Sequence, residues 1–180
     1  VTFASRRMGK GNREIRKDVR SFAADVRQLR HKARMNNATY RLVINMPESQ
    51  SEQQSYWVEV TNKKFLLNYS DDFAKKQKEA IEKKEKDPSD FEVDHSLSHG
   101  GPQPLPSPLY FESVEIAAQK KEYTAGRLYI HFFPEGRVEE AVIHIGNRDK
   151  LHWSMALHPL TGRVDLIDKD KKLKDMLLDQ

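Results

Sequence analysis

Three histidines in the C-terminal half of this sequence are the residues whose type and spacing could hold a metal ion. His131 and His144 lie in two apolar segments joined through the turn Pro134–Arg137, and His152 lies in the segment that follows. If the first two segments pair as a hairpin, their imidazoles could face one another. A zinc site needs three or four converging ligands, however, and no carboxylate or cysteine completes a recognisable spacing. We therefore assign no metal site and interpret these histidines as side chains of half-exposed strands.

Other motifs of known enzymes are incomplete in this chain. His95 and His99 stand at i and i+4, but the glutamate of a zincin helix is missing. Gly9-Lys10-Gly11-Asn12 lacks the spacing of a phosphate-binding loop, no Gly-x-Ser-x-Gly occurs, and there is no cysteine. Glu139 and Glu140 are adjacent on an expected strand, so their carboxylates point to opposite faces. We predict no catalytic residue, no cofactor and no enzymatic activity.

Positive charge is concentrated near the beginning of the sequence. The whole chain of 180 residues carries a net charge of +4. Residues 1–34 hold eleven Lys or Arg and three Asp or Glu, a net charge of +8, which leaves −4 for the rest. This asymmetry indicates a contact surface for lipid headgroups, nucleic acid or an acidic neighbouring subunit. The candidate contact residues are Arg13, Arg16, Arg20 and Arg27.

Residues 12–36 predict a long amphipathic helix, because their apolar side chains recur at helical spacing. The apolar stripe consists of Ile15, Val19, Phe22, Ala23, Val26, Leu29 and Ala33. Asn12 is the expected N-cap, and Asn36-Asn37 is the expected left-handed C-cap. The basic residues mostly avoid the stripe, so we expect one buried face and one charged face.

No stretch of the sequence approaches the ~20 consecutive apolar residues that a membrane-spanning helix needs. The first residues, Val1–Ser5 followed by Arg6-Arg7, are nevertheless typical of the last turn of an apolar segment and its charged flank. We therefore expect that an apolar anchor precedes Val1 in the complete protein.

The remaining pattern is that of strands interrupted by one polar block. Strands are expected over 39–46 and 56–60, and an antiparallel meander over 110–116, 127–133, 138–145, 151–157 and 163–167. The charged and proline-rich block 62–108 reads as an insertion, with a solvated helix in Asp71–Lys86. Residues 168–180 predict a short tail helix. We expect one α+β domain, in which a long N-terminal helix packs on antiparallel β-sheets.

Three groups of segments, taken in this order, resemble the pilin-like minor pseudopilins of bacterial type II secretion, in particular the H-type. The first is the N-terminal helix followed directly by Tyr40-Arg41-Leu42-Val43-Ile44 and then by Ser55-Tyr56-Trp57-Val58-Glu59-Val60. The second is Ile130-His131-Phe132-Phe133-Pro134-Glu135-Gly136-Arg137, followed by Ala141-Val142-Ile143-His144-Ile145. The third is Leu157-His158-Pro159-Leu160-Thr161-Gly162-Arg163-Val164.

The resemblance implies a non-catalytic assembly subunit of the type II secretion pseudopilus. Its partners would be other major and minor pseudopilins, the inner membrane through an N-terminal helix outside these residues, and secreted substrate. The globular domain would lie in the periplasm. The resemblance covers about residues 13–60 and 110–167 and transfers no processing or anchor residue to this sequence.

Two other functions remain open from the sequence. A minor pilin of a type IV pilus would show the same pattern. A soluble basic module would bind nucleic acid or anionic lipid through the arginines of the helix. Nucleic acid is the less favoured partner, because Phe22 is the only aromatic residue of the helix and it lies on the apolar stripe.

Overall fold

A computed structural model describes residues 11–49, 51–67, 70–83, 90–96, 101–148, 151–169 and 172–176, and it begins with the helix α1 (Asn12–Asn36). All seven residues of the predicted apolar stripe are buried on one face of α1. Asn12 is the first helical residue rather than the N-cap, because the extended residue is Gly11, which has no side chain to cap the helix. At the other end, Asn37 adopts the left-handed conformation expected for it, with φ 48°.

The strands form two antiparallel sheets. The first has the order β3 (Glu92–Val93), β2 (Ser55–Thr61), β1 (Thr39–Met46) and β6 (Gly126–Phe132). The second has the order β5 (Lys121–Tyr123), β4 (Tyr110–Ile116), β7 (Ala141–Gly146), β8 (His152–Leu157) and β9 (Val164–Ile167). A short 3-10 helix, η1 (Ala117–Gln119), links β4 to β5.

The expected meander is wrong at one strand. β6 leaves the C-terminal strands and pairs with β1, opposite β2, so that Leu42 lies between Val58 and Ile130. β7, β8 and β9 do form a consecutive antiparallel series. The strands β3 and β5 are too short to have been detected by alternation, and β7 begins at Ala141 instead of Val138.

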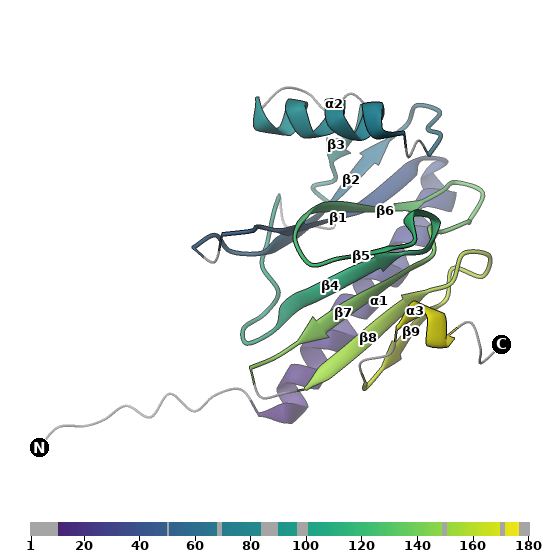
Figure 1. The fold of residues 1–180 in the computed structure, drawn as a ribbon. Helices are drawn as coiled ribbons and strands as arrows, with labels where there is room; N and C mark the ends of the chain where they lie inside the picture. The colour runs from purple at the N-terminus through teal and green to yellow at the C-terminus, as the bar shows by residue number, and fades with distance from the viewer. Residues whose placement is uncertain are drawn as a thin grey trace, which may run out of the picture.

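The helix α1 lies across both sheets, as Figure 1 shows, and packs on β1, β6 and β9. Its apolar stripe joins side chains of both sheets in one hydrophobic core. At the centre, the rings of Phe22 of α1, Tyr56 of β2 and Phe111 of β4 meet edge to face, with centroids 4.9 to 6.1 Å apart. The predicted fold class, a long N-terminal helix on antiparallel sheets, is confirmed.

The polar block between β2 and β4 contributes to this fold. It contains α2 (Asp71–Glu82), which lies beyond β3 at one end of the molecule in Figure 1. It also supplies β3 to the first sheet and Leu105 to the core. The described part of the C-terminal segment contains the one-turn helix α3 (Leu173–Met176). Among the helices of the described ranges, none combines the length and the hydropathy needed to cross a membrane.

The face of β1 that points away from the core carries a buried charge. Arg41 is 1% exposed, and its Nε donates a 2.6 Å hydrogen bond to Glu59 Oε2 on β2. Trp57 Nε1 donates to the other oxygen of the same carboxylate, at 2.7 Å. The guanidinium lies between two rings, 4.0 Å from the centroid of Phe91 and 4.2 Å from that of Tyr129. Phe91 thus ties the polar block to the first sheet.

We predict that Glu59→Gln lowers the free energy of unfolding by about 3 kcal/mol, because it removes the negative charge that contacts a buried guanidinium. Urea unfolding, followed by tryptophan fluorescence, measures the loss. The matched control is Glu135→Gln, whose partner Arg137 is about half exposed at 3.4 Å. That variant should lose less than about 1 kcal/mol. Equal losses in the two variants would contradict the stabilising role assigned to the buried pair of Arg41 and Glu59.

The ring cluster predicts a pH dependence. Burial, with a smaller effect of the Asp25 charge, raises the pKa of Tyr56 to about 12. The unfolded chain binds its tyrosine protons less tightly, with an ordinary pKa of about 10. The stability that the neutral Tyr56 phenol contributes is therefore complete below pH 10 and is lost as the pH rises towards 12. Ultraviolet titration should show a late tyrosinate phase that Tyr56→Phe removes, and its persistence in that variant would refute the prediction.

Candidate functional site

Arginines of α1 bind the carbonyl groups of two segments far along the chain. Arg27 donates from Nε and Nη2 to the Val164 carbonyl oxygen, at 3.2 and 2.8 Å. Arg30 donates from Nε to the Gly136 carbonyl oxygen, at 2.8 Å. Gly136 belongs to the turn after β6, and Val164 begins β9. These bonds join the basic side of the helix to both sheets.

The glycine of each turn allows an arginine to approach. Gly162 has φ +61°, and a Cβ atom added to it would lie 1.9 Å from Cδ of Arg30. Gly136 has φ +93°, and an added Cβ atom would lie 3.1 Å from Cδ of Arg34. Both turns therefore need glycine for the backbone conformation and for the contact with α1.

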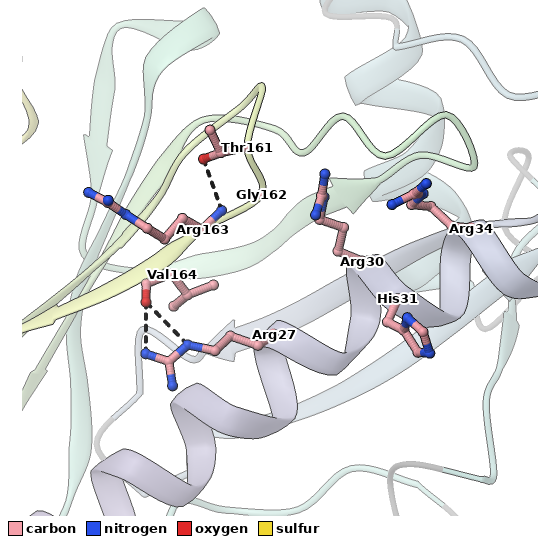
Figure 2. Close-up of a pocket in the computed structure, with 8 residues that line it drawn as sticks. All are labelled: Arg27, Arg30, His31, Arg34, Thr161, Gly162, Arg163 and Val164. Carbon is pink, nitrogen blue, oxygen red and sulfur yellow. Dashed lines mark hydrogen bonds between the residues drawn. The ribbon is translucent and has the colours of Figure 1, made fainter.

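A groove lies between this side of α1 and the turn that precedes β9. Figure 2 shows Arg27, Arg30 and Arg34 along the helix, with Thr161 and Gly162 across from them. The groove has a volume of about 460 Å³, and its lining consists of Arg27, Arg30, His31, Arg34, Thr161, Gly162, Arg163 and Val164. No Asp or Glu is among these eight residues. The site is therefore strongly cationic and suited to an anion.

The four arginines predicted from the sequence are not brought together. Arg13 and Arg20 are exposed on α1, and Arg16 forms an exposed pair with Asp168 at 3.7 Å. Arg27 alone lines the groove. The contact role assigned to the set stays a prediction.

Sequence reasoning missed the other basic side chains of the groove, which are Arg30, His31, Arg34 and Arg163. Arg27, Arg30 and Arg34 follow the spacing i, i+3 and i+7, which places them on one side of a helix. That spacing was a usable signal in the sequence. The other side of the groove could not be predicted, because Arg27 and its partner Val164 are 137 positions apart.

The predicted approach of His131 to His144 is wrong, because β6 and β7 belong to different sheets. His131 Nδ1 lies 2.8 Å from a Glu139 carboxylate oxygen, and its ring stacks on Phe65. His144 Nε2 lies 2.8 Å from Glu115 Oε1. His152 has its own carboxylate partner, Glu112, at 2.9 Å. Each histidine is thus paired with a carboxylate that lies elsewhere in the sequence.

One cluster has the composition of a metal site. Side-chain ligand atoms of Glu115, Glu122 and His144 lie within 4.8 Å of one another. The Lys172 ammonium group binds Glu122 at 2.5 Å, and Ser113 Oγ donates to the same carboxylate at 2.6 Å. These two bonds hold the pKa of Glu122 below its usual value. The Lys172 ammonium group therefore faces the cluster. Its bond to Glu122 fastens the C-terminal segment to the second sheet.

Comparisons with known proteins identify no family. No family model matches the chain, and no curated protein matches its sequence. Among solved structures, the chain is similar to the minor pseudopilin EpsH from the type 2 secretion system of Vibrio cholerae, with a TM-score of 0.45 and 10% sequence identity. The superposition covers 87% of this chain and 98% of that chain.

We predict that Gly162→Ala destabilises the protein through both backbone strain and the clash with Arg30, at a cost of about 2 kcal/mol. Arg30→Ala removes the clashing atoms. The cost of Gly162→Ala should therefore be smaller by about 1 kcal/mol when it is measured in the Arg30→Ala background. Denaturant unfolding of the four proteins completes the cycle.

Gly126→Ala is the matched control for this cycle. Gly126 has φ +100°, with no atom within 4 Å of an added Cβ, so this variant reports backbone strain alone. Its cost should be the same with and without Arg30. An additive cycle for Gly162 would show that the turn does not pack on the arginine.

Proposed function

We propose that this protein is a non-catalytic, pilin-like assembly subunit, and more specifically a minor pseudopilin of a type II secretion system. The observation that carries the proposal is α1: one face of a single long helix is buried across two antiparallel sheets, while the opposite face is basic and exposed. The three groups of sequence segments that resemble minor pseudopilins form this helix, the strands β1 and β2, and the two glycine turns that α1 contacts.

The proposed mechanism is presentation of surfaces. The core fixes the globular part rigidly to α1, so that any force or contact on the helix is transmitted to both sheets. An apolar helix preceding α1 would enter the inner membrane and the filament, and the globular domain would lie in the periplasm. The exposed side of α1 would contact neighbouring pseudopilins, and exposed loops would be available to other subunits or secreted substrate.

Photo-crosslinking tests this assembly role. These 180 residues contain no cysteine, so Ser21→Cys gives them a single attachment point for a benzophenone maleimide, on the exposed side of α1. The native host should express the complete reading frame with this variant. Illumination of the labelled membranes from these cells should then yield adducts with other pilin-like subunits. A label at Ser51→Cys, in the exposed turn between β1 and β2, is the matched control and should give a different or weaker set.

Two outcomes would refute the proposal. One is a complete reading frame with no apolar helix of ~20 residues before α1. The other is the recovery of the protein outside the membrane fraction, without pilin-like adducts from Ser21→Cys. A minor pilin of a type IV pilus is the nearest alternative, and the identity of the crosslinked subunits separates it from a pseudopilin.

The exposed arginines of α1 favour a second candidate, a soluble basic module for nucleic acid or anionic lipid. Under this alternative, the wild-type protein shifts DNA or binds anionic vesicles at low salt, and the double variant Arg16→Glu with Arg20→Glu abolishes the binding. We expect no binding that depends on these two residues. A loss of binding confined to the double variant would favour the module.

A further inference from the structure

The groove beside α1 has an excess of hydrogen-bond donors. A guanidinium offers five N–H donors in one plane. Arg30 uses its Nε for the Gly136 carbonyl, and Arg27 uses Nε and Nη2 for the Val164 carbonyl. Arg163 is paired outside the lining with Asp165, at 2.7 Å. Toward the residues that the structure describes, several charged donors of Arg27, Arg30 and Arg34 are thus left for a ligand.

The carbonyl bonds also fix the direction of the free donors. A flexible arginine loses side-chain entropy when it binds a ligand, and this loss weakens binding. Arg27 and Arg30 are already held by the backbone at 2.8 Å, and Arg34 packs on Gly136. The cost of ordering Arg27 and Arg30 is therefore met during folding, while the contact with Gly136 restrains the stem of Arg34. Such preorganised guanidinium groups bind carboxylates in a planar, two-bond geometry.

The spacing of the arginines defines the form of the anion. At a rise of 1.5 Å per residue, Arg27 and Arg34 are about 10 Å apart along the helix axis, with Arg30 between them. Two or three carboxylates separated by about 5 to 6 Å match this row. Acidic side chains at i and i+3 or i+4 of a helix have that separation.

We propose that the groove binds an acidic segment of a neighbouring subunit, with Asp or Glu side chains seated on Arg27, Arg30 and Arg34. The identity of the partner as a subunit of the same filament rests on the proposed function. The chemistry of the groove does not rest on it, because the excess of positive charge and the fixed donors belong to this chain alone.

A membrane surface is a poorer occupant than a protein segment. If an anchor precedes α1, the membrane lies at the Asn12 end of the helix. Arg30 is 18 residues from that end, or about 27 Å at the helical rise. This distance is about three Debye lengths at physiological salt, so headgroup charge is largely screened at the groove.

Nucleic acid also fits the groove poorly. None of the eight lining residues is Phe, Tyr or Trp, so the His31 imidazole is the one ring in the lining on which a base could stack. Two or three phosphates along a row of about 10 Å would provide weak binding that depends on salt alone. The lining therefore favours a short acidic peptide segment over a nucleic acid strand.

The first test measures the groove by itself with a fluorescent hexaglutamate peptide as the probe. Fluorescence anisotropy at low salt should detect binding to the wild-type protein, and salt should weaken it. Arg34→Glu should weaken binding about tenfold or more, because it places a negative charge in the groove. Arg34→Gln, which keeps the length of the side chain without its charge, should weaken it to a smaller extent.

Lys17→Glu is the matched control, since it makes the same change of charge at an exposed position of α1 outside the groove. It should change the affinity less than about twofold. Absence of binding, or equal losses in Lys17→Glu and Arg34→Glu, would overturn the proposal, because the peptide would then report net charge only. Thermal unfolding of each variant verifies that the fold is intact, and Arg34→Gln serves as the test variant if Arg34→Glu unfolds.

The second test uses the assembled protein and separates this inference from the assembly role. A benzophenone at Thr161→Cys, on the rim of the groove, should crosslink to a filament subunit at a peptide rich in Asp or Glu. Arg34→Glu should abolish that adduct while the Ser21→Cys adducts persist. If the Ser21→Cys adducts form and Thr161→Cys yields lipid, nucleic acid or no adduct, the inference fails and the assembly role stands. If both sets of adducts are lost while hexaglutamate binding is retained, the partner is not a subunit of the same filament.

Discussion

The structure depends on the burial of one apolar stripe of α1 across two sheets at once. The two sheets have no hydrogen-bonded neighbouring strands in common among those described. The core beneath the helix holds the two sheets together, because Phe22 contacts Tyr56 of one sheet and Phe111 of the other. The two buried rings, Phe22 and Phe111, each contribute on the order of 2 to 3 kcal/mol of transfer free energy. Loss of the helix would therefore separate the sheets.

Because one side of α1 is committed to the core, its polar side has to make the remaining contacts. Near its C-terminal end it does so with arginines whose apolar stems lie on two glycine turns and whose head groups bind backbone carbonyls. This arrangement gathers several cations at the junction of the helix and the second sheet. The junction both joins the helix to the sheet and is the strongest candidate for a site that binds an anion.

Much of the fold follows from periodicity in the sequence. The helix 12–36 and the strand 39–46 were predictable because each has one strongly alternating or amphipathic pattern over at least eight residues. The strand β3 was not, because two residues have no pattern and β3 forms only by pairing with β2. The burial of Arg41 was equally hidden, since it depends on Phe91, which is 50 positions away in a block that the sequence marks as polar.

The same distinction applies to the site. The excess of arginine in the helix was visible in the sequence, but its distribution among carbonyls, carboxylates and solvent was not. The partner of His131 could not be inferred either, because β6 and β7 belong to different sheets and Glu139, in the segment between them, lies close to His131. Long-range pairing of strands decides such contacts, and composition carries little information about it.

The bond from Arg27 to Val164 has a further consequence for the behaviour of the protein at high concentration. β9 is the edge strand of its sheet among the strands that the structure describes, and an open strand edge is a template on which another chain can add and begin to aggregate. At the start of β9, an outward carbonyl oxygen is already occupied by a charged side chain that an incoming strand would have to displace. The arginine thereby opposes edge-to-edge stacking at this end of the strand.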